Sequence, residues 1–329
     1  MARGNSYLAA VLGTCALLTG LSAYAELGVC YEESGNVLVY GGSWYGFWSK
    51  SADSQTVWVR DASEETESAI WQGTRPFDHL ALSPSGGVIA LLEHTPQRSP
   101  CLVLITTDGT ELNRLEGVQK YVWSPDGAQV AYIAGPSDED YPGFKSTGTW
   151  VYSLSSNAST KAYTSGYDLN WAAFDGSLYI WEGSPNQGLV HRYEPRTQEL
   201  CESEYKGIFF SPDGKYVYRP NYEGTPFRLF LTQTNEEVTE KWPFLAARPE
   251  RRSPEGWLDE ETLVFHSRRA NPKTDLLFSL RSGTLKEAPG KTIAYTSDKR
   301  HLFVLAPTGI EKVPVAALAE VSPDGADPR

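Results

Sequence analysis

The sequence has 329 residues and a formal net charge of -12, with 29 Lys and Arg against 41 Asp and Glu. A protein with a net negative charge repels nucleic acid and anionic membrane surfaces, so we expect neither as a partner. Its 40% hydrophobic content is enough for a buried core and excludes a disordered chain, and its 18 Tyr, 12 Phe and 10 Trp favour β-strands.

Residues 1–25 have the pattern of a secretory signal peptide. Arg3 precedes the apolar run YLAAVLGTCALLTGLSAYA, whose last three residues match a small-x-small cleavage site. An uncleaved membrane anchor is the alternative, but Gly and Thr dilute the run, which falls short of the ~20 strongly apolar residues of a membrane span. We therefore expect cleavage after Ala25, export of residues 26–329 as a single domain, and no stable insertion into the membrane.

Three cysteines remain after cleavage: Cys30, Cys101 and Cys201. Their spacing matches no metal motif, and an odd number does not make a disulfide framework. We expect small buried side chains in strands, and one disulfide plus a free thiol is the alternative.

One pattern recurs along the rest of the chain: an extended segment, a tight turn and a second extended segment. The clearest turn is SPDG at 124–127, where Pro presets φ and Gly closes a type I turn between YVW and QVAYIA. In chain order the copies lie at 28–42, 80–94, 121–135, 169–183, 208–221, 256–269 and 293–306. Their turns follow one another at 51, 41, 49, 38, 46 and 39 residues, close to the ~40–45 residues of a four-stranded propeller blade.

Each hairpin is followed by further segments rich in strand-forming residues, such as 56–61 and 67–72 after the first copy and 227–243 after the fifth. These units predict an all-β chain folded as a β-propeller of four-stranded blades. One blade cannot bury both faces of its sheet, so the blades must stack around a central axis. Seven hairpins predict seven blades, or six if the first or last copy only closes the ring.

The SPDG turn between an aromatic-rich strand and a second strand, followed by W-V-Y and L-V-L-I strands, resembles the WD40-like propeller repeats of the TolB type. Similar repeats form the propellers of prolyl-oligopeptidase-type enzymes. The resemblance covers nearly all of 26–329 and implies the fold, but a fold alone does not define a function. TolB-type proteins carry an N-terminal α/β domain and oligopeptidases a hydrolase domain, and neither is found here. We therefore expect a bare propeller, periplasmic or secreted in a bacterium.

No motif predicts catalysis. The stretch GGSWYG at 41–46 lacks the second glycine of a serine-hydrolase elbow, because Tyr45 takes its place. The five histidines lie far apart and form no HExxH pair, so we expect no metal site and no cofactor. Carboxylates are plentiful but cannot be paired from one sequence, so a propeller hydrolase or lyase with a carboxylate/His site remains an alternative.

Loops between second and third strands, and links between blades, line one rim in the propellers that this chain resembles. The first such loop holds Trp44, Tyr45 and Trp48, which suit stacking on sugars or holding a peptide, or else fill the packing between blades. The same mapping places on this rim Arg75, His79, Asp138 and Tyr141.

Five arginines cluster in the sixth unit of this acidic chain: Arg248, Arg251, Arg252, Arg268 and Arg269. Arginines bind carboxylate or phosphorylated partners through bidentate contacts, and a solvated rim balanced by nearby Glu is the alternative. We predict an exported, non-catalytic module that binds a protein or peptide partner in the cell envelope through its rim loops. Lectin-like binding of envelope carbohydrate through the Trp44–Trp48 loop is the second hypothesis, and the hydrolase or lyase is the third.

Overall fold

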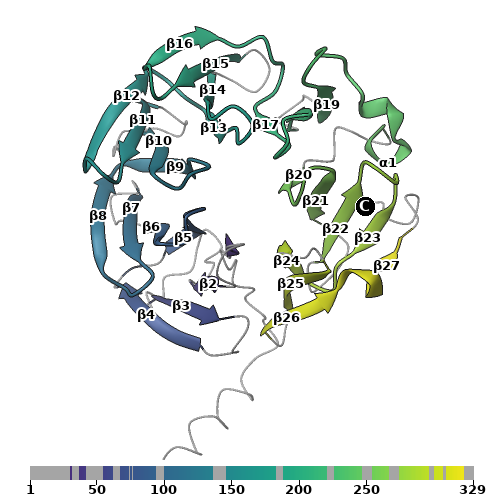
Figure 1. Ribbon diagram of the computed structural model, residues 1–329, viewed down its shortest axis with the longest axis horizontal. Helices are drawn as coiled ribbons and strands as arrows, with labels where there is room; N and C mark the ends of the chain where they lie inside the picture. The colour runs from purple at the N-terminus through teal and green to yellow at the C-terminus, as the bar shows by residue number, and fades with distance from the viewer. Residues whose placement is uncertain are drawn as a thin grey trace, which may run out of the picture.

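A computed structural model describes residues 30–31, 37–41, 55–61, 67–73, 75, 77–93, 100–135, 146–182, 188–220, 226–246, 254–266, 274–295, 300–306 and 309–321. The described strands form seven sheets, and the chain visits them in turn around a ring with a central axis (Figure 1). Each pair of these strands is antiparallel, from β1 with β2 to β25 with β26. The predicted all-β propeller is therefore confirmed.

The first four sheets each take four consecutive strands, from the axis outward. The first contains β1 (Cys30–Tyr31), β2 (Val37–Gly41), β3 (Gln55–Asp61) and β4 (Glu67–Gly73). The second contains β5 (Phe77–Leu82), β6 (Val88–Glu93), β7 (Cys101–Thr106) and β8 (Glu111–Glu116). The third contains β9 (Val118–Trp123), β10 (Gln129–Ala134), β11 (Gly148–Ser153) and β12 (Ala158–Tyr163). The fourth contains β13 (Asp168–Trp171), β14 (Leu178–Glu182), β15 (Leu189–Glu194) and β16 (Glu199–Glu202).

The last three sheets depart from this plan. The fifth has three described strands, β17 (Phe209–Phe210), β18 (Tyr216–Arg219) and β19 (Arg228–Leu231). The sixth has five, β20 (Pro254–Trp257), β21 (Thr262–His266), β22 (Asp275–Ser279), β23 (Leu285–Glu287) and β27 (Ala319–Glu320). The seventh has three, β24 (Lys291–Tyr295), β25 (His301–Ala306) and β26 (Gly309–Pro314). Within the described residues, five sheets therefore have the four strands of a complete blade, fewer than the seven or six blades expected.

The segment 227–243 supplies one strand where the sequence predicts two. After β19 the chain forms a single bridge between Phe230 and Glu237, then a 3-10 helix (Thr239–Lys241) and a short helix α1 (Pro243–Ala246). Proline cannot donate to a strand ladder but suits the first turn of a helix, which explains where the extended chain ends.

Helix α1 packs between the fifth and sixth sheets. Phe244 and Leu245 are buried and belong to an apolar cluster that joins the fifth and sixth sheets. The ring of Phe244 stacks on that of Phe278, with centroids 4.9 Å apart. The indole N–H of Trp242 donates to the carbonyl of Leu280 at 3.0 Å and so anchors the helix to the sixth sheet.

The SPDG turn lies between the first and second strands of its sheet, as predicted. The N–H of Gln129 donates to Ser124 Oγ at 2.9 Å, and Ser124 Oγ donates to Asp126 Oδ1 at 2.6 Å. Asp126 also accepts the N–H of Ala128 at 3.0 Å, and Gly127 has a φ of 68°. The fifth sheet repeats these bonds with Ser211, Asp213, Lys215 and Tyr216. The recurring sequence pattern is therefore a recurring hydrogen-bonded turn.

Apolar layers between neighbouring sheets hold the ring together. Consecutive residues of β6 face opposite layers: Leu91 packs in the cluster that joins the first and second sheets, and Leu92 in the cluster that joins the second and third. Cys101 is a free thiol buried in one of these layers, as expected, whereas Cys201 is a free but exposed thiol. Cys201 lies on β16, an outer strand whose residues are all exposed, so the prediction of burial is wrong for it.

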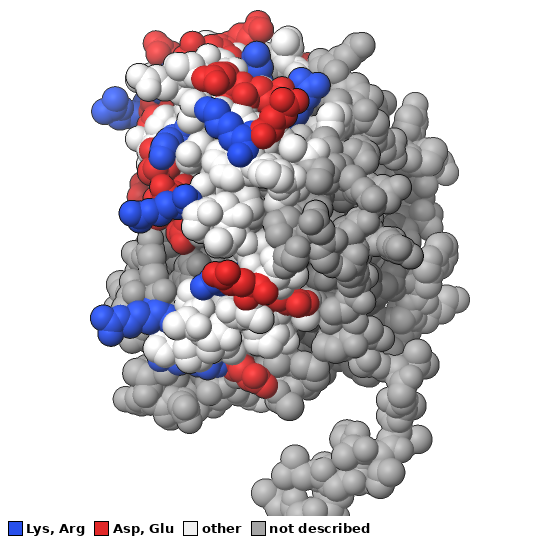
Figure 2. All heavy atoms as spheres, turned by 90° about the vertical axis from the view of Figure 1, so that its right-hand side faces the viewer, with Lys and Arg blue, Asp and Glu red and all other residues white. Residues whose placement is uncertain are grey.

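The strand order defines two rims. The turns between first and second strands, and between third and fourth strands, lie at one end of the sheets, here called the turn rim. The loops between second and third strands and the links between sheets lie at the other end, here called the loop rim. Figure 2, which faces the sheets on the right of Figure 1, shows basic and acidic side chains of the described residues interspersed.

The two ends of the ring meet where β1 lies beside β24. The chain after β26 turns back, so that β27 pairs with β23, with Glu320 opposite Lys286. None of the first sheet's four strands comes from the C-terminal part of the described chain.

Candidate functional site

The innermost strands of four neighbouring sheets enclose a cavity of about 430 Å³ at the central channel. It is lined by residues of β5, β6, β9, β13 and β17, and along β9 it runs from Gln119 near the loop-rim end to Trp123 at the turn-rim end. Its wall combines polar residues with apolar ones, among them Leu80, Leu92, Val122, Leu169 and Phe209. A concave site with apolar walls and a few polar groups is typical of ligand-binding sites.

One ion pair crosses this wall between the third and fourth sheets. Lys120 Nζ lies 3.0 Å from Asp168 Oδ2, and it also lies 5.7 Å from the ring centre of Tyr167. The Lys120 side chain is 43% exposed, so the cation remains accessible from the cavity. A positive and a negative group are thus presented side by side.

His79 enters the same cavity from a strained backbone position. It lies in β5 where the register with β6 shifts between Asp78 and Ala81, and its φ is 46°. A left-handed φ in a residue other than glycine costs about 1–2 kcal/mol, and such strain is concentrated at functional sites. The Tyr121 hydroxyl hydrogen-bonds to the His79 carbonyl and lies 2.8 Å from that of Ala90, so the third sheet fixes this conformation.

The structure describes two of the predicted site residues, Arg75 and His79, and both are exposed. His79 lines the channel cavity, and Arg75 lies in the link between β4 and β5 on the loop rim. The other predicted residues lie outside the described residues: Trp44, Tyr45, Trp48, Asp138, Tyr141, Arg251, Arg252, Arg268 and Arg269.

Sequence reasoning missed Gln119, Lys120 and Asp168. A signal was present, because Gln119 and Lys120 interrupt the otherwise apolar and aromatic segment VQKYVW. A charged residue in an innermost strand can be solvated in the central channel.

A second polar cluster joins the third and fourth sheets at the loop rim. Glu182 Oε2 accepts hydrogen bonds from the Tyr163 hydroxyl and from His191 Nε2, the latter at 2.8 Å. The rings of Tyr163 and His191 lie 4.4 Å apart. The bonds from Tyr163 and then His191 lower the pKa of Glu182, whereas burial and then Glu182 raise the pKa of Tyr163 to about 12. The sequence could not pair these residues, because each comes from a different strand.

Two negative findings concern the described residues only. In these segments no three His, Cys, Asp or Glu side chains gather in an arrangement that could hold a metal ion. No helix there has the length and apolar character needed to cross a membrane.

The ring of radial four-stranded sheets and its turns have the fold of WD40-like, TolB-type β-propellers. No protein-family model matches the sequence. No curated protein matches it either. TolB from Acinetobacter baumannii has a TM-score of 0.51 and 17% identity over 78% of this chain, which spans 64% of that chain.

Propellers of enzymes are similar as well. The β-propeller domain of the Trilobed protease from Pyrococcus furiosus has a TM-score of 0.55 and 11% identity, over 93% of this chain and 98% of that chain. An oligogalacturonate lyase in complex with manganese has a TM-score of 0.50 and 12% identity, over 73% of this chain and 72% of that chain. At these identities the likeness shows the fold alone.

Proposed function

We propose that this chain is an exported, non-catalytic interaction module, which binds a protein or peptide partner at the loop rim and channel mouth. The observation that carries the proposal is the channel cavity, whose 430 Å³ lies in the range of ligand sites. Lys120 and Asp168 offer both charges to a peptide backbone or side chain, and Phe209 offers an apolar wall. Asp168 and Lys120 pair at 3.0 Å, so the two charges lie together on the cavity wall.

The proposal includes a cell-envelope setting. Residues 1–25 would be the cleaved signal peptide, and 26–329 the single exported domain, periplasmic or secreted in a bacterium. Binding of envelope sugars through Trp44, Tyr45 and Trp48 stays a prediction, because those residues lie outside the described part of the chain.

We also propose that the propeller has seven blades, and that the two three-stranded sheets are incomplete blades. In the fifth sheet, Leu231 N–H donates to Glu236 O at 2.9 Å and Val238 N–H to Leu229 O at 2.8 Å, so a short segment occupies the fourth position. In the seventh, the chain leaves after β26 and supplies β27 to the sixth sheet. Seven radial units also match the seven hairpins of the sequence.

The test is cross-linking in intact cells with the tagged full chain, followed by mass spectrometry of captured proteins. His79→Gly removes the channel imidazole while glycine adopts its φ of 46° without strain. Gln198→Gly is the matched control, because Gln198 also has a left-handed φ, 58°, but lies between β15 and β16 on the turn rim.

We expect one reproducible partner with the wild-type chain and with Gln198→Gly, and its loss with His79→Gly. No partner at all, or equal capture by the three proteins, would reject the proposal.

A further inference from the structure

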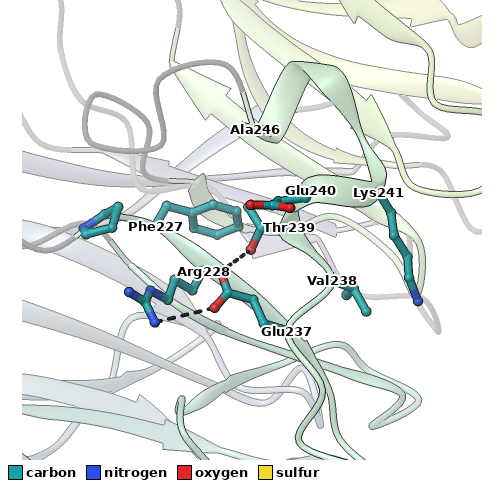
Figure 3. Close-up of a pocket in the computed structure, with 9 residues that line it drawn as sticks. Phe227, Arg228, Glu237, Val238, Thr239, Glu240, Lys241 and Ala246 are labelled. Atoms are coloured by element: carbon teal, nitrogen blue, oxygen red, sulfur yellow. Dashed lines mark hydrogen bonds and ion pairs between the residues drawn. The ribbon is translucent and has the colours of Figure 1, made fainter.

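A larger cavity, of about 750 Å³, lies between β19, the 3-10 helix and α1, where the fifth sheet lacks a regular fourth strand. Arg228, Glu237, Thr239 and Lys241 are among the residues that line it (Figure 3). Phe227 and Val238 also line it, but they are almost fully buried in the apolar cluster that joins the fifth and sixth sheets. Arg228 begins β19, so the cavity lies at the loop rim.

The carboxylate in this cavity is already engaged. Glu237 Oε2 lies 3.4 Å from Arg228 Nη1, and Glu237 Oε1 accepts a hydrogen bond from Thr239 Oγ1 at 3.2 Å (Figure 3). Thr239 Oγ1 also accepts the N–H of Leu229 at 2.9 Å, which fixes its position. The contact between Glu237 and Arg228 is therefore a long one.

A second guanidinium group stands beside the first. Arg219 is the cross-strand neighbour of Arg228 in the β18–β19 register, so both side chains lie on the same face of the sheet. Arg219 Nε is buried and has no hydrogen-bond partner among the described residues. Burial, and then the charge of Arg228, lower the pKa of Arg219. The charge of Glu237, which Arg228 already engages, partly offsets this effect. A half-buried cation that shares its counter-ion gains a stronger partner when an anion binds.

We propose that Arg219 and Arg228 form a carboxylate-binding subsite on the loop rim, which takes the C-terminal or an acidic side-chain carboxylate of a bound peptide. The subsite deepens the proposed function, on which the peptide origin of the carboxylate rests.

The charges favour a carboxylate over a phosphate group. Among the described residues, Arg219, Arg228 and Lys241 carry three positive charges, and Glu237, Glu240 and Glu236, which lies 3.7 Å from Lys241, carry three negative ones. A carboxylate therefore adds a single negative charge to a balanced site. A phosphate group with nearly two negative charges would place excess charge beside Glu237.

The test follows the arginine Nε–H signals of the full chain in a ¹H–¹⁵N NMR spectrum. A buried Nε–H is protected from exchange, and its signal is assigned by its loss in Arg219→Gln. Four probes are compared at matched ionic strength. N-acetylalanine has a terminal carboxylate, and N-acetylaspartic acid α-amide has a side-chain carboxylate. N-acetylalanine amide has no carboxylate, and the fourth probe is inorganic phosphate.

We expect both carboxylate probes to shift the Arg219 signal saturably, and neither the amide nor phosphate to do so. The tighter of the two carboxylates identifies the terminal or side-chain source. Binding to the Arg219 variants is followed through the backbone N–H signal of Arg228 in the same spectrum. Arg219→Gln should weaken binding about tenfold or more, because a charge-assisted bond is lost. Arg219→Lys keeps the charge without the planar fork and should lose less. Arg281→Gln, an exposed arginine between β22 and β23 on the turn rim, should bind as wild type does.

The subsite is rejected if no carboxylate gives a saturable shift, if phosphate binds more tightly than both, or if Arg281→Gln weakens binding as much as Arg219→Gln. Because the probes are small and no partner is present, this result is independent of partner capture in cells. Failure of the subsite and failure of the proposed function are therefore distinguishable.

Discussion

The turn rim offers a test of how neighbouring blades pack. Gly127 and Gly176 close equivalent turns of the third and fourth sheets, with φ values of 68° and 73°. A Cβ added at Gly127 would lie 2.7 Å from the backbone nitrogen of Ser85 in the turn of the second sheet, whereas one added at Gly176 would meet nothing within 4 Å. The two alanine substitutions therefore introduce the same backbone strain, but only the one at Gly127 adds a close contact between blades.

Alanine in the left-handed region costs about 1 kcal/mol, and overpacking against a rigid neighbour adds about 1–3 kcal/mol. We expect Gly176→Ala to lower the free energy of unfolding by about 1 kcal/mol and Gly127→Ala by about 2–4 kcal/mol. Urea denaturation of the full chain, followed by tryptophan fluorescence, measures both. Equal losses for the two variants would refute the role assigned to the contact with Ser85.

Three further predictions concern stability and reactivity. Ser211→Ala should cost about 1–3 kcal/mol, because the N–H of Tyr216, 2.9 Å from Ser211 Oγ, loses a buried acceptor; an unchanged urea midpoint would contradict this. Burial raises the pKa of Cys101 to about 11, so peptide mapping after thiol alkylation of the native chain should find Cys201 modified and Cys101 intact; early modification of Cys101 would be the opposite result. Tyr163→Phe removes a hydrogen bond that lowers the pKa of Glu182 in the folded chain. The wild-type chain should therefore melt at a higher temperature than the variant at pH values above the pKa of Glu182 in the unfolded chain. This difference should vanish as the pH falls through the lower pKa of the folded chain. A difference in melting temperature that does not change with pH would count against that bond.

The positions of the hairpins could be predicted because turn chemistry is local. Ser124, Pro125, Asp126 and Gly127 carry within four residues the hydrogen bonds and backbone angles that the turn needs. The alternation of strands and turns then fixed the class of fold, and the structure confirms it.

Features that depend on neighbouring sheets could not be predicted in the same way. The segment 227–243 has the residues of two strands, but packing of Phe244 into the gap beside the sixth sheet favours a helix there. The pairing of Lys120 with Asp168 joins different sheets, and no local pattern marks it. His79 was predicted on the rim from the family resemblance, but its strained φ comes from the bulge in β5 and the contact with Tyr121.

The most direct test of binding at the channel mouth is site-specific photo-cross-linking of the full chain in intact cells that express it. The photoreactive residue is placed at position 119, on the channel cavity, or at position 198, on the turn rim. A partner held at the channel mouth predicts one covalent adduct from position 119 and none from position 198. Adducts from position 198 without any from position 119 would contradict the proposed site.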